Sequence, residues 1–354
     1  MAPPQWTISI LTIPGREEYL QRLLASLDGL GATRPVVQLV YNRPVREQLA
    51  EIERRLRSWA PARAVEVYFN SGDPTISGGR NFQLNLVKTP LVCFVDDDVS
   101  FEGPVLETAE EALRSRPVAI VGLPSLRNDC EERFKPRDNT PHILDGTFRW
   151  TVVQGLFAAG YTHLFRDAGG FNARRRFWGE WTELNLRLWR LGFPTGYAMG
   201  GGFLRHWEEA PDSPTRNLEG RELHVLWGII CTALEYDAVD VTEATSTFWQ
   251  LVEERYLSYS FGEALSPRTV LQATLALMPD VSAAWGDISA FRQQVKDHPF
   301  PFAPFHAFTR QDLDQILPHA RKQIRQYREG IWPERKSVVS GIREWVKRVA
   351  GRGS

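Results

Sequence analysis

The chain has 354 residues, of which 43% are hydrophobic, and its formal net charge is -1. This length argues for two domains rather than one, because single cores stop growing beyond about 250 to 300 residues. The balanced charge argues against a nucleic-acid binder that relies on a global basic field, and no stretch approaches the roughly 18 apolar residues of a membrane span. The three cysteines are widely separated and form no zinc pattern, so we expect a reducing, cytoplasmic setting.

The first part of the chain alternates between strand and helix patterns. Strands are predicted over residues 7–12, 36–41, 64–69, 91–95 and 118–121. Helices are predicted over residues 17–30, 45–59, 80–87 and 104–114. This order predicts an α/β fold with a mostly parallel, Rossmann-like sheet wound by right-handed crossovers.

Two later stretches differ in character. Residues 127–141 are polar, contain two prolines and show no periodicity, so a surface loop or lid is predicted. Past about residue 215 the patterns are helical, over residues 222–236, 246–257, 269–278, 288–296 and 311–328. We therefore divide the chain into an α/β domain over residues 1–215 and a helical C-terminal domain over residues 216–354.

Three consecutive acids, Asp96, Asp97 and Asp98, follow the apolar run Leu91–Val95. Such a run is typical of a strand buried on both faces, and its carboxyl end is where open α/β sheets bind ligands. Acids crowded there repel one another unless a positive charge lies between them. A hard divalent cation that is itself bound to a phosphate is the favoured interpretation, and a solvated acidic turn is the alternative.

A glycine pair precedes one of the predicted helices. Gly78 and Gly79 allow close backbone approach, and the helix start after them presents free N–H groups to an anion, with Arg80 as a charged clamp. This pattern predicts a phosphate-facing loop, although any turn from strand to helix can carry two glycines.

Two glutamates lie three residues apart after Gly179. On a helix the carboxylates of Glu180 and Glu183 share a face near the amino-terminal end, so either is a candidate general base. For Glu183, an ordinary surface ion pair with Arg187 is an equal alternative.

His206 follows the run Gly200–Gly202 and is the third candidate for chemistry. A neutral imidazole can complete an oxygen-rich site for manganese, but an isolated histidine usually has no chemical role. The residues alone leave the two readings open.

Together these segments resemble the GT-A glycosyltransferases, particularly glycosyltransferase family 2, with features of the β-galactosyltransferases. The resemblance covers roughly residues 7–208. It includes the opening strand and turn Ile10–Arg16, the Gly-Gly-Arg-Asn helix start, the Asp-x-Asp motif at Asp96–Asp98, Gly169–Asn172, and the later Trp-Gly-Glu and Arg-His pairs.

The resemblance implies roles for matching residues. The nucleoside base would be held by side chains at the ends of the first two strands: Thr12, Pro14, Arg16 and Asn42. Asp98 and His206 would bind Mn²⁺ or Mg²⁺, and Asp96 would lie by the ribose and the metal. Asp97, Gly79 and Arg80 would complete the site for the nucleotide, and a UDP-sugar is the expected donor.

Trp181 departs from the pattern. Inverting relatives often have Gly-Glu-Asp, in which the Asp deprotonates the acceptor, and tryptophan cannot act as a base. Either Glu180 or Glu183 has this role, or the reaction retains configuration without a base, or activity is lost. Glu180 is our choice, since its place beside Trp178 and Trp181 suits a sugar-binding floor.

The resulting hypothesis is a metal-dependent, inverting glycosyltransferase that acts on a carbohydrate or lipid-linked acceptor. The alternatives are a non-catalytic binder of nucleotide-sugars or glycans and a sugar-phosphate nucleotidyltransferase. The turn Ile13–Arg16 is too short and too poor in glycine for the latter.

The last residues form a basic amphipathic pattern over 336–352. Such a helix either lies in an anionic membrane interface or packs against the helical domain or a second subunit. Peripheral membrane association and a homo-oligomer therefore both stay open.

Overall fold

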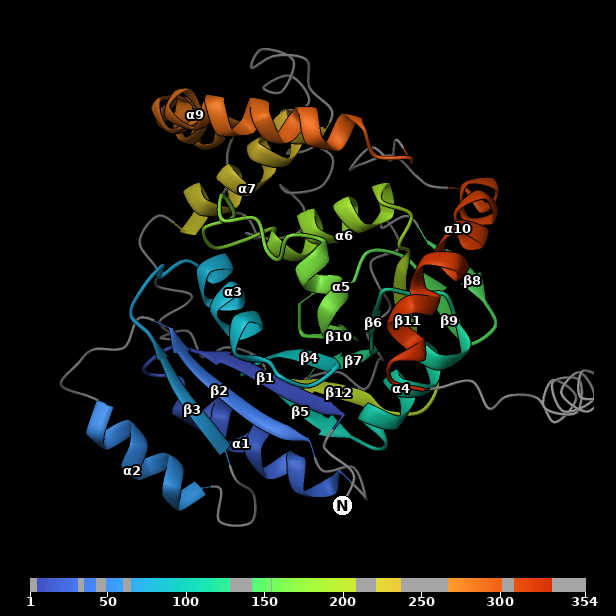
Figure 1. Ribbon diagram of the computed structural model, residues 1–354. Coiled ribbons are helices and arrows are strands. Elements are labelled where there is room, and N and C mark those ends of the chain that lie inside the picture. The colour runs from blue at the N-terminus through green and yellow to red at the C-terminus, as the bar shows by residue number, and fades with distance from the viewer. Residues whose placement is uncertain are drawn as a thin grey trace, which may run out of the picture.

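The computed structural model describes residues 5–30, 35–42, 49–59, 65–127, 142–153, 155–207, 221–236, 267–300 and 309–332 (Figure 1). The predicted loop after Arg127, the helix predicted over 246–257 and the basic pattern over 336–352 lie outside these residues.

A nine-stranded sheet forms the centre of the molecule, in the order β3-β2-β1-β4-β10-β6-β11-β9-β8. Its strands are β1 (Trp6–Thr12), β2 (Val36–Asn42), β3 (Val65–Asn70), β4 (Leu91–Asp96), β6 (Ile120–Gly122), β8 (Ile143–Asp145), β9 (Phe148–Trp150), β10 (Phe157–Tyr161) and β11 (Thr195–Ala198). The half from β3 to β4 is parallel, as predicted, whereas β10 runs antiparallel to both β4 and β6. The predicted α/β class with a mostly parallel Rossmann-like core is confirmed.

A second sheet of three strands lies beside the first. It consists of β5 (Val99–Glu102), β12 (Phe203–His206) and β7 (Ser125–Arg127) in the order β5-β12-β7. Strands β5 and β12 are antiparallel, and their register places His206 opposite Val99. This pairing brings a residue from late in the chain next to the end of β4.

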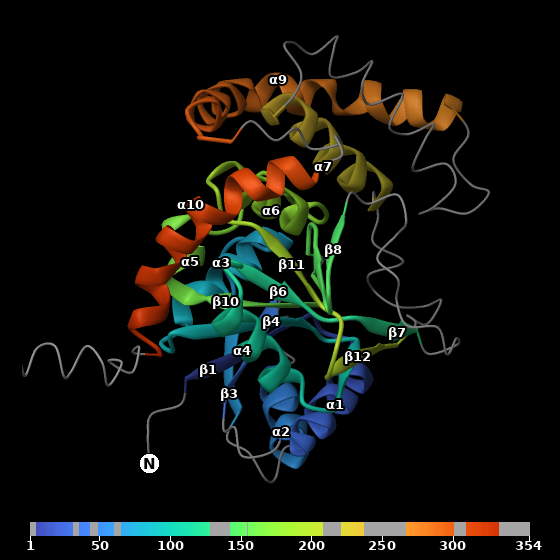
Figure 2. The ribbon, with the colours of Figure 1, turned by 90° about the vertical axis from the view of Figure 1, so that its right-hand side faces the viewer.

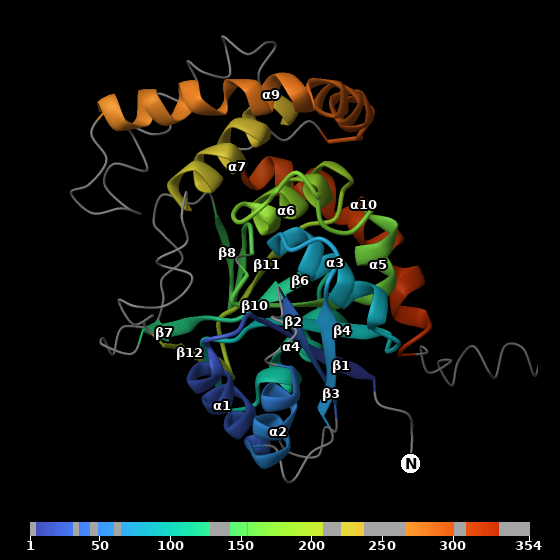
Figure 3. The ribbon, with the colours of Figure 1, turned by 90° about the vertical axis from the view of Figure 1, so that its left-hand side faces the viewer.

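Helices cover both faces of the nine-stranded sheet. Their bounds are α1 (Glu17–Ser26), α2 (Leu49–Trp59), α3 (Ile76–Leu86), α4 (Val105–Ser115), α5 (Thr162–Asp167) and α6 (Glu180–Arg190). Helices α1 and α2 lie on one side of the sheet, and α3, α5 and α6 lie on the other (Figures 1 and 3). Helix α3 begins four residues before its predicted start, because the Thr75 side chain caps it by accepting a hydrogen bond from the Gly78 amide at 3.0 Å.

In the described residues after the second sheet the helices are α7 (Arg221–Tyr236), α9 (Pro267–Lys296) and α10 (Arg310–Glu329). Helix α9 lies across α7, on the side away from the sheet (Figure 2). The break predicted between residues 278 and 288 is wrong, since α9 is continuous through Pro279. Buried side chains recur along one face at helical spacing, at Leu277, Val281, Ile288 and Val295, and their packing keeps the helix intact.

Helix α10 packs directly on the α/β core. Its buried side chains, Leu313, Ile316, Ala320 and Ile324, belong to the same hydrophobic cluster as the central strands. Near its end, Arg328 donates from Nε to the Leu113 carbonyl at 2.8 Å and from Nη2 to the Arg116 carbonyl. A cation there also opposes the partial negative charge at the end of α4. The division of the chain at residue 215 stays a prediction.

No helix in the described part of the chain is long and apolar enough to cross a membrane.

We expect Arg328→Met to lower the free energy of unfolding by about 1.5 to 3 kcal/mol, because hydrogen bonds from a charged donor to two carbonyls are lost. Arg325→Met is the matched control on the same helix. Its ion pair with Glu329 is exposed, so this change should lower the free energy of unfolding by about 0.5 kcal/mol or less. Urea denaturation measures both, and equal effects would contradict the docking role of Arg328.

Candidate active site

The three acids lie where the sheet predicts, at the carboxyl end of β4. Residues Leu91–Val95 are fully buried, and Asp96 ends the strand. Asp97 and Asp98 form the turn into β5. Because β1, β2 and β4 are parallel, Thr12 and Asn42 end at the same edge.

The Asp97 side chain is buried, and its carboxylate binds groups of the protein itself. Its Oδ2 accepts a hydrogen bond from the Thr12 hydroxyl at 2.6 Å, and Arg16 Nε donates to both its oxygens at 2.9 Å. Arg16 Nη2 also forms an ion pair with Asp97 Oδ1, at 2.7 Å. The side chains of Thr12 and Arg16, predicted to hold a nucleoside base, are therefore engaged with a buried acid, which needs this compensation to stay ionised.

Asp98 differs from Asp97 in keeping one oxygen without a partner. Oδ2 accepts from Arg16 Nη2 at 2.9 Å and lies 3.7 Å from His206 Nε2, whereas the buried Oδ1 has no hydrogen-bond partner in the described residues. Burial acts to raise the pKa of Asp98, but His206 and Arg16 outweigh it and hold the pKa below its ordinary value. The backbone fixes the pair, since the Trp207 amide donates to the Asp98 carbonyl at 2.8 Å.

Asp98 and His206 together fit a hard divalent cation. Oxygen and imidazole donors suit manganese, and the buried Oδ1 has a lone pair to give. The three predicted ligands do not form one cluster, because the described residues contain no group of three or more His, Cys, Asp or Glu that could hold a metal. Asp96 turns instead to Arg80, so Asp98 and His206 are the two predicted ligands that lie together in the described part of the chain.

Arg80 is the buried cation next to Asp96. Its Nη2 donates to Asp96 Oδ1 and its Nη1 donates to Gln83 Oε1 at 3.2 Å, whereas its Nε has no partner in the described structure. The glycines before it serve packing: a Cβ at Gly79 would lie 2.9 Å from Leu11 Cδ1. They let α3 approach the ends of the strands, which places the guanidinium at the acids.

Asn42 organises a loop. Its Nδ2 donates to the carbonyls of Pro74 at 3.0 Å and Thr75 at 3.1 Å, and its Oδ1 accepts from Asn70 at 2.7 Å. The side-chain amide predicted for the base is thus used within the turn before α3. Pro14 is half-buried, in the turn between β1 and α1.

Glu180 is the first residue of α6 and follows Gly179, whose φ of +87° is a left-handed conformation that favours glycine. Only 6% of Glu180 is exposed. The pKa of Glu180 is raised to about 7, chiefly by burial and in part by the negative charge of Asp96, while the positive charge of Arg80 opposes the rise. A carboxyl group in this state exchanges a proton near neutral pH.

Glu183 has no atom left for a substrate. It is fully buried, and both its oxygens accept hydrogen bonds from Arg187, at 3.0 and 2.9 Å. The Tyr236 hydroxyl donates to its Oε1 at 2.7 Å. The alternative prediction for Glu183, an ion pair with Arg187, agrees with the structure, although the pair is buried and does not lie on the surface.

Trp181 belongs to the core. It is 5% exposed and packs edge-on against Phe171 and Phe94, with ring centroids 4.9 and 5.8 Å away. The expectation that Trp181 forms an open floor for a sugar is wrong, since its ring fills the space between α6 and the sheet.

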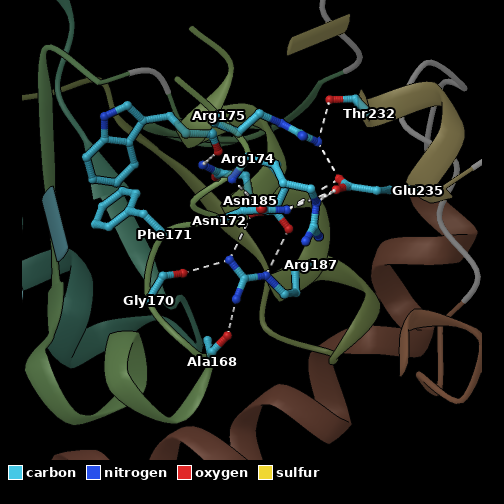
Figure 4. A network of polar contacts seen from close by, with 12 residues as sticks. Ala168, Gly170, Phe171, Asn172, Arg174, Arg175, Asn185, Arg187, Thr232 and Glu235 are labelled. Carbon is cyan, nitrogen blue, oxygen red and sulfur yellow. Dashed lines mark hydrogen bonds and ion pairs between the residues drawn. The ribbon is translucent and has the colours of Figure 1, made fainter. Parts of the chain in front are cut away.

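The Gly-Gly-Phe-Asn segment is held by residues that the sequence reading missed. Asn81 donates to the Phe171 carbonyl and accepts from the Phe171 amide, both at 2.8 Å. Asn172, Arg174 and Arg175 reach Glu235 of α7 (Figure 4). The sequence signal for this network was an acid, Glu235, at the end of the apolar run 226–234. An acid in such a place is expected to be buried, and a buried charge requires a partner.

Comparisons with known proteins find relatives in structure alone. No protein family and no curated protein matches the sequence. TarS from S. aureus, residues 1–349, superposes with a TM-score of 0.51 at 13% identity, covering 93% of each chain. GalNAc-T7, solved with UDP, GalNAc and Mn²⁺, gives 0.54 at 10% identity, covering 90% of this chain and 58% of its own. Both are GT-A glycosyltransferases, and at these identities the likeness shows the fold: the chain has the predicted GT-A fold.

The raised pKa of Glu180 predicts a pH-dependent effect of Glu180→Gln on stability. Between its ordinary pKa of 4.5 and the folded value of about 7, the native state binds the proton more tightly than the unfolded state, so this group's contribution is lost as pH rises. The variant should therefore gain stability relative to the wild type between pH 5 and pH 8, by up to about 3 kcal/mol, because one pKa unit corresponds to about 1.4 kcal/mol.

Urea denaturation at the two pH values measures this difference. Glu183→Gln is the control on the same helix, and it should destabilise at both pH values because Arg187 loses a charged partner. A Glu180→Gln difference that is constant with pH would contradict the shifted pKa.

Proposed function

We propose that this protein is a metal-dependent glycosyltransferase that moves a sugar from a nucleotide diphosphate sugar to an acceptor hydroxyl with inversion. The observation that carries the proposal is the Asp98–His206 pair at the carboxyl edge of a GT-A sheet. GalNAc-T7, which shares the fold, was solved with UDP and Mn²⁺, and this supports a UDP-sugar and Mn²⁺ or Mg²⁺ here.

The acids and arginines would divide the work of binding the donor. Asp98 Oδ1 and His206 would hold the cation, which supplies Lewis-acid stabilisation of the leaving diphosphate when bound. Asp96, whose side chain is 33% exposed, can accept hydrogen bonds from the ribose. Arg80 contributes a buried positive charge beside it, which favours an anionic donor.

Glu180 would act as the general base. As the acceptor oxygen forms its bond to the anomeric carbon and the bond from that carbon to the phosphate oxygen breaks, the hydroxyl proton passes to the Glu180 carboxylate. A base with a pKa near the working pH combines a sufficient ionised fraction with a sufficient driving force. Glu183 is excluded from this role by its contacts with Arg187 and Tyr236.

A non-catalytic binder of nucleotide-sugars or glycans is the second candidate. It is favoured by Trp181, which fills the position of the usual base and is packed into the core. A carbohydrate or lipid-linked acceptor, membrane contact, an oligomer and a cytoplasmic setting are predictions from the sequence.

The first test measures thermal stabilisation by UDP with Mn²⁺, together with hydrolysis of UDP-sugars. Binding to the native state raises its apparent stability by about 2.7 kcal/mol when the ligand is at 100 times its Kd. Asp98→Ala should abolish both the metal-dependent shift and turnover, and His206→Ala should weaken both. Glu102→Gln, which removes a partly exposed acid paired with Arg205, is the control and should change neither. Unchanged UDP affinity in Asp98→Ala protein would exclude the metal role.

The second test concerns the base. Glu180→Gln should lower kcat by about 100-fold or more while the Kd for UDP is retained, the usual scale of general-base catalysis. Because the active form is the carboxylate, wild-type kcat should rise with pH through about 7 and then level off. If Glu180→Gln transfers sugar at the wild-type rate, a retaining mechanism without a base replaces this one. If the wild-type protein binds UDP but neither transfers sugar nor hydrolyses UDP-sugars, the second candidate function, a non-catalytic binder, is correct.

A further inference from the structure

One acid of α7, Glu235, is buried against the turn that leads into α6. The Glu235 side chain has no exposed surface. Its Oε1 accepts a hydrogen bond from Arg174 Nε at 2.6 Å, and its Oε2 accepts from Arg175 Nη2 at 2.5 Å. Asn172 Nδ2 donates to Oε1 at 3.2 Å. All three donors come from one short turn, and they converge on one carboxylate (Figure 4).

Arg175 depends on this carboxylate for its place. The residue is fully buried, and its Nη2 donates hydrogen bonds to Glu235 and to the Thr232 hydroxyl, the latter at 3.0 Å. Its Nε and Nη1 have no hydrogen-bond partner within the described residues. A buried guanidinium that loses its carboxylate is strongly destabilised. Without Glu235, the hydrogen bond to the neutral Thr232 hydroxyl is the side-chain contact that would remain to Arg175 among the described residues.

We call the contacts of Glu235 with Asn172, Arg174 and Arg175 the clamp. Other contacts extend it along residues 172–179. From α7, Trp227 Nε1 donates to the Arg174 carbonyl at 2.6 Å. A Cβ at Gly228 would lie 2.6 Å from the Trp178 carbonyl oxygen, so α7 packs against the backbone here. From α3, the Ile76 amide donates to the Arg176 carbonyl at 2.8 Å. The turn is thus fixed on two sides immediately before α6 begins.

We infer that Glu235 is a positioning residue, which holds residues 172–179 through Arg174 and Arg175 and so sets where α6 presents the Glu180 carboxylate. The catalytic meaning of this position rests on the proposed function. The clamp itself is a property of the folded chain and is measurable without turnover.

The variant Glu235→Gln keeps the shape of the side chain and removes its charge. We expect kcat to fall about 10- to 100-fold, because a displacement of about 1 Å in a catalytic group costs up to about 100-fold. The Kd for UDP with Mn²⁺ should stay within about twofold, since the donor site lies at β4 and β12. Backbone amide exchange, followed by mass spectrometry, should become faster across residues 172–184.

Tyr236→Phe is the matched control from the next position of α7. It removes one buried hydroxyl, bonded to Glu183 at 2.7 Å, and leaves the turn untouched. The stability of Tyr236→Phe should fall, while amide exchange across residues 172–179 should not change. If Glu235→Gln does not fold, Arg174→Gln replaces it. That change removes one of the two ion pairs from a side chain that is 20% exposed, and the same pattern should appear at smaller size.

Unchanged kcat and unchanged exchange in the folded variant would overturn the inference, as would an equal increase of exchange across residues 172–179 in Tyr236→Phe. If wild-type protein transfers no sugar, the proposed function fails separately. The exchange measurement then decides on its own whether Glu235 clamps the turn.

Discussion

Three consecutive carboxylates at the end of a buried strand must be balanced by positive charge, and the arrangement of the site depends on this compensation. Asp97 and Asp98 share the guanidinium of Arg16, while Asp96 pairs with Arg80. Both arginines are almost fully buried. Because a buried charge that loses its partner is costly, these pairs constrain the turn after β1 and the start of α3 to lie at the end of β4.

The same compensation gives three identical residues different chemistry. Asp97 uses both oxygens inside the protein. Asp98 keeps Oδ1 without a partner within the described chain and faces His206, so it can still bind a cation. Asp96 keeps a third of its side chain open to solvent. In the proposed function the three acids therefore differ through their partners, and the middle acid, Asp97, serves to hold the turn.

The two glutamates of α6 show a similar separation of roles. Glu183 is neutralised by Arg187 and tied to α7 through Tyr236, so it fastens one helix to another. Glu180, one turn earlier, lies in a buried setting with no single partner that dominates its charge, and its pKa moves toward neutrality. The turn before it is fastened by Glu235. Buried ion pairs thus hold the scaffold, and the group proposed for proton transfer is a buried carboxyl group whose charge is incompletely compensated.

Sequence by itself determined the features that depend on neighbours along the chain. The run Leu91–Val95 specifies a buried strand with acids at its end, and the alternating patterns specify a parallel Rossmann-like half sheet, because burial periodicity is a local property. Tertiary structure decided which partner each charge meets. The direction of Arg16, the different surroundings of Glu180 and Glu183 and the place of Trp181 in the core all depend on contacts between segments far apart. The proximity of His206 to Asp98 depends on the pairing of β12 with β5, and the placement of the turn before α6 depends on an acid some 60 positions away, at Glu235. A local pattern records that such residues are charged or aromatic, but the energy of a buried charge is set by the groups that the fold places around it.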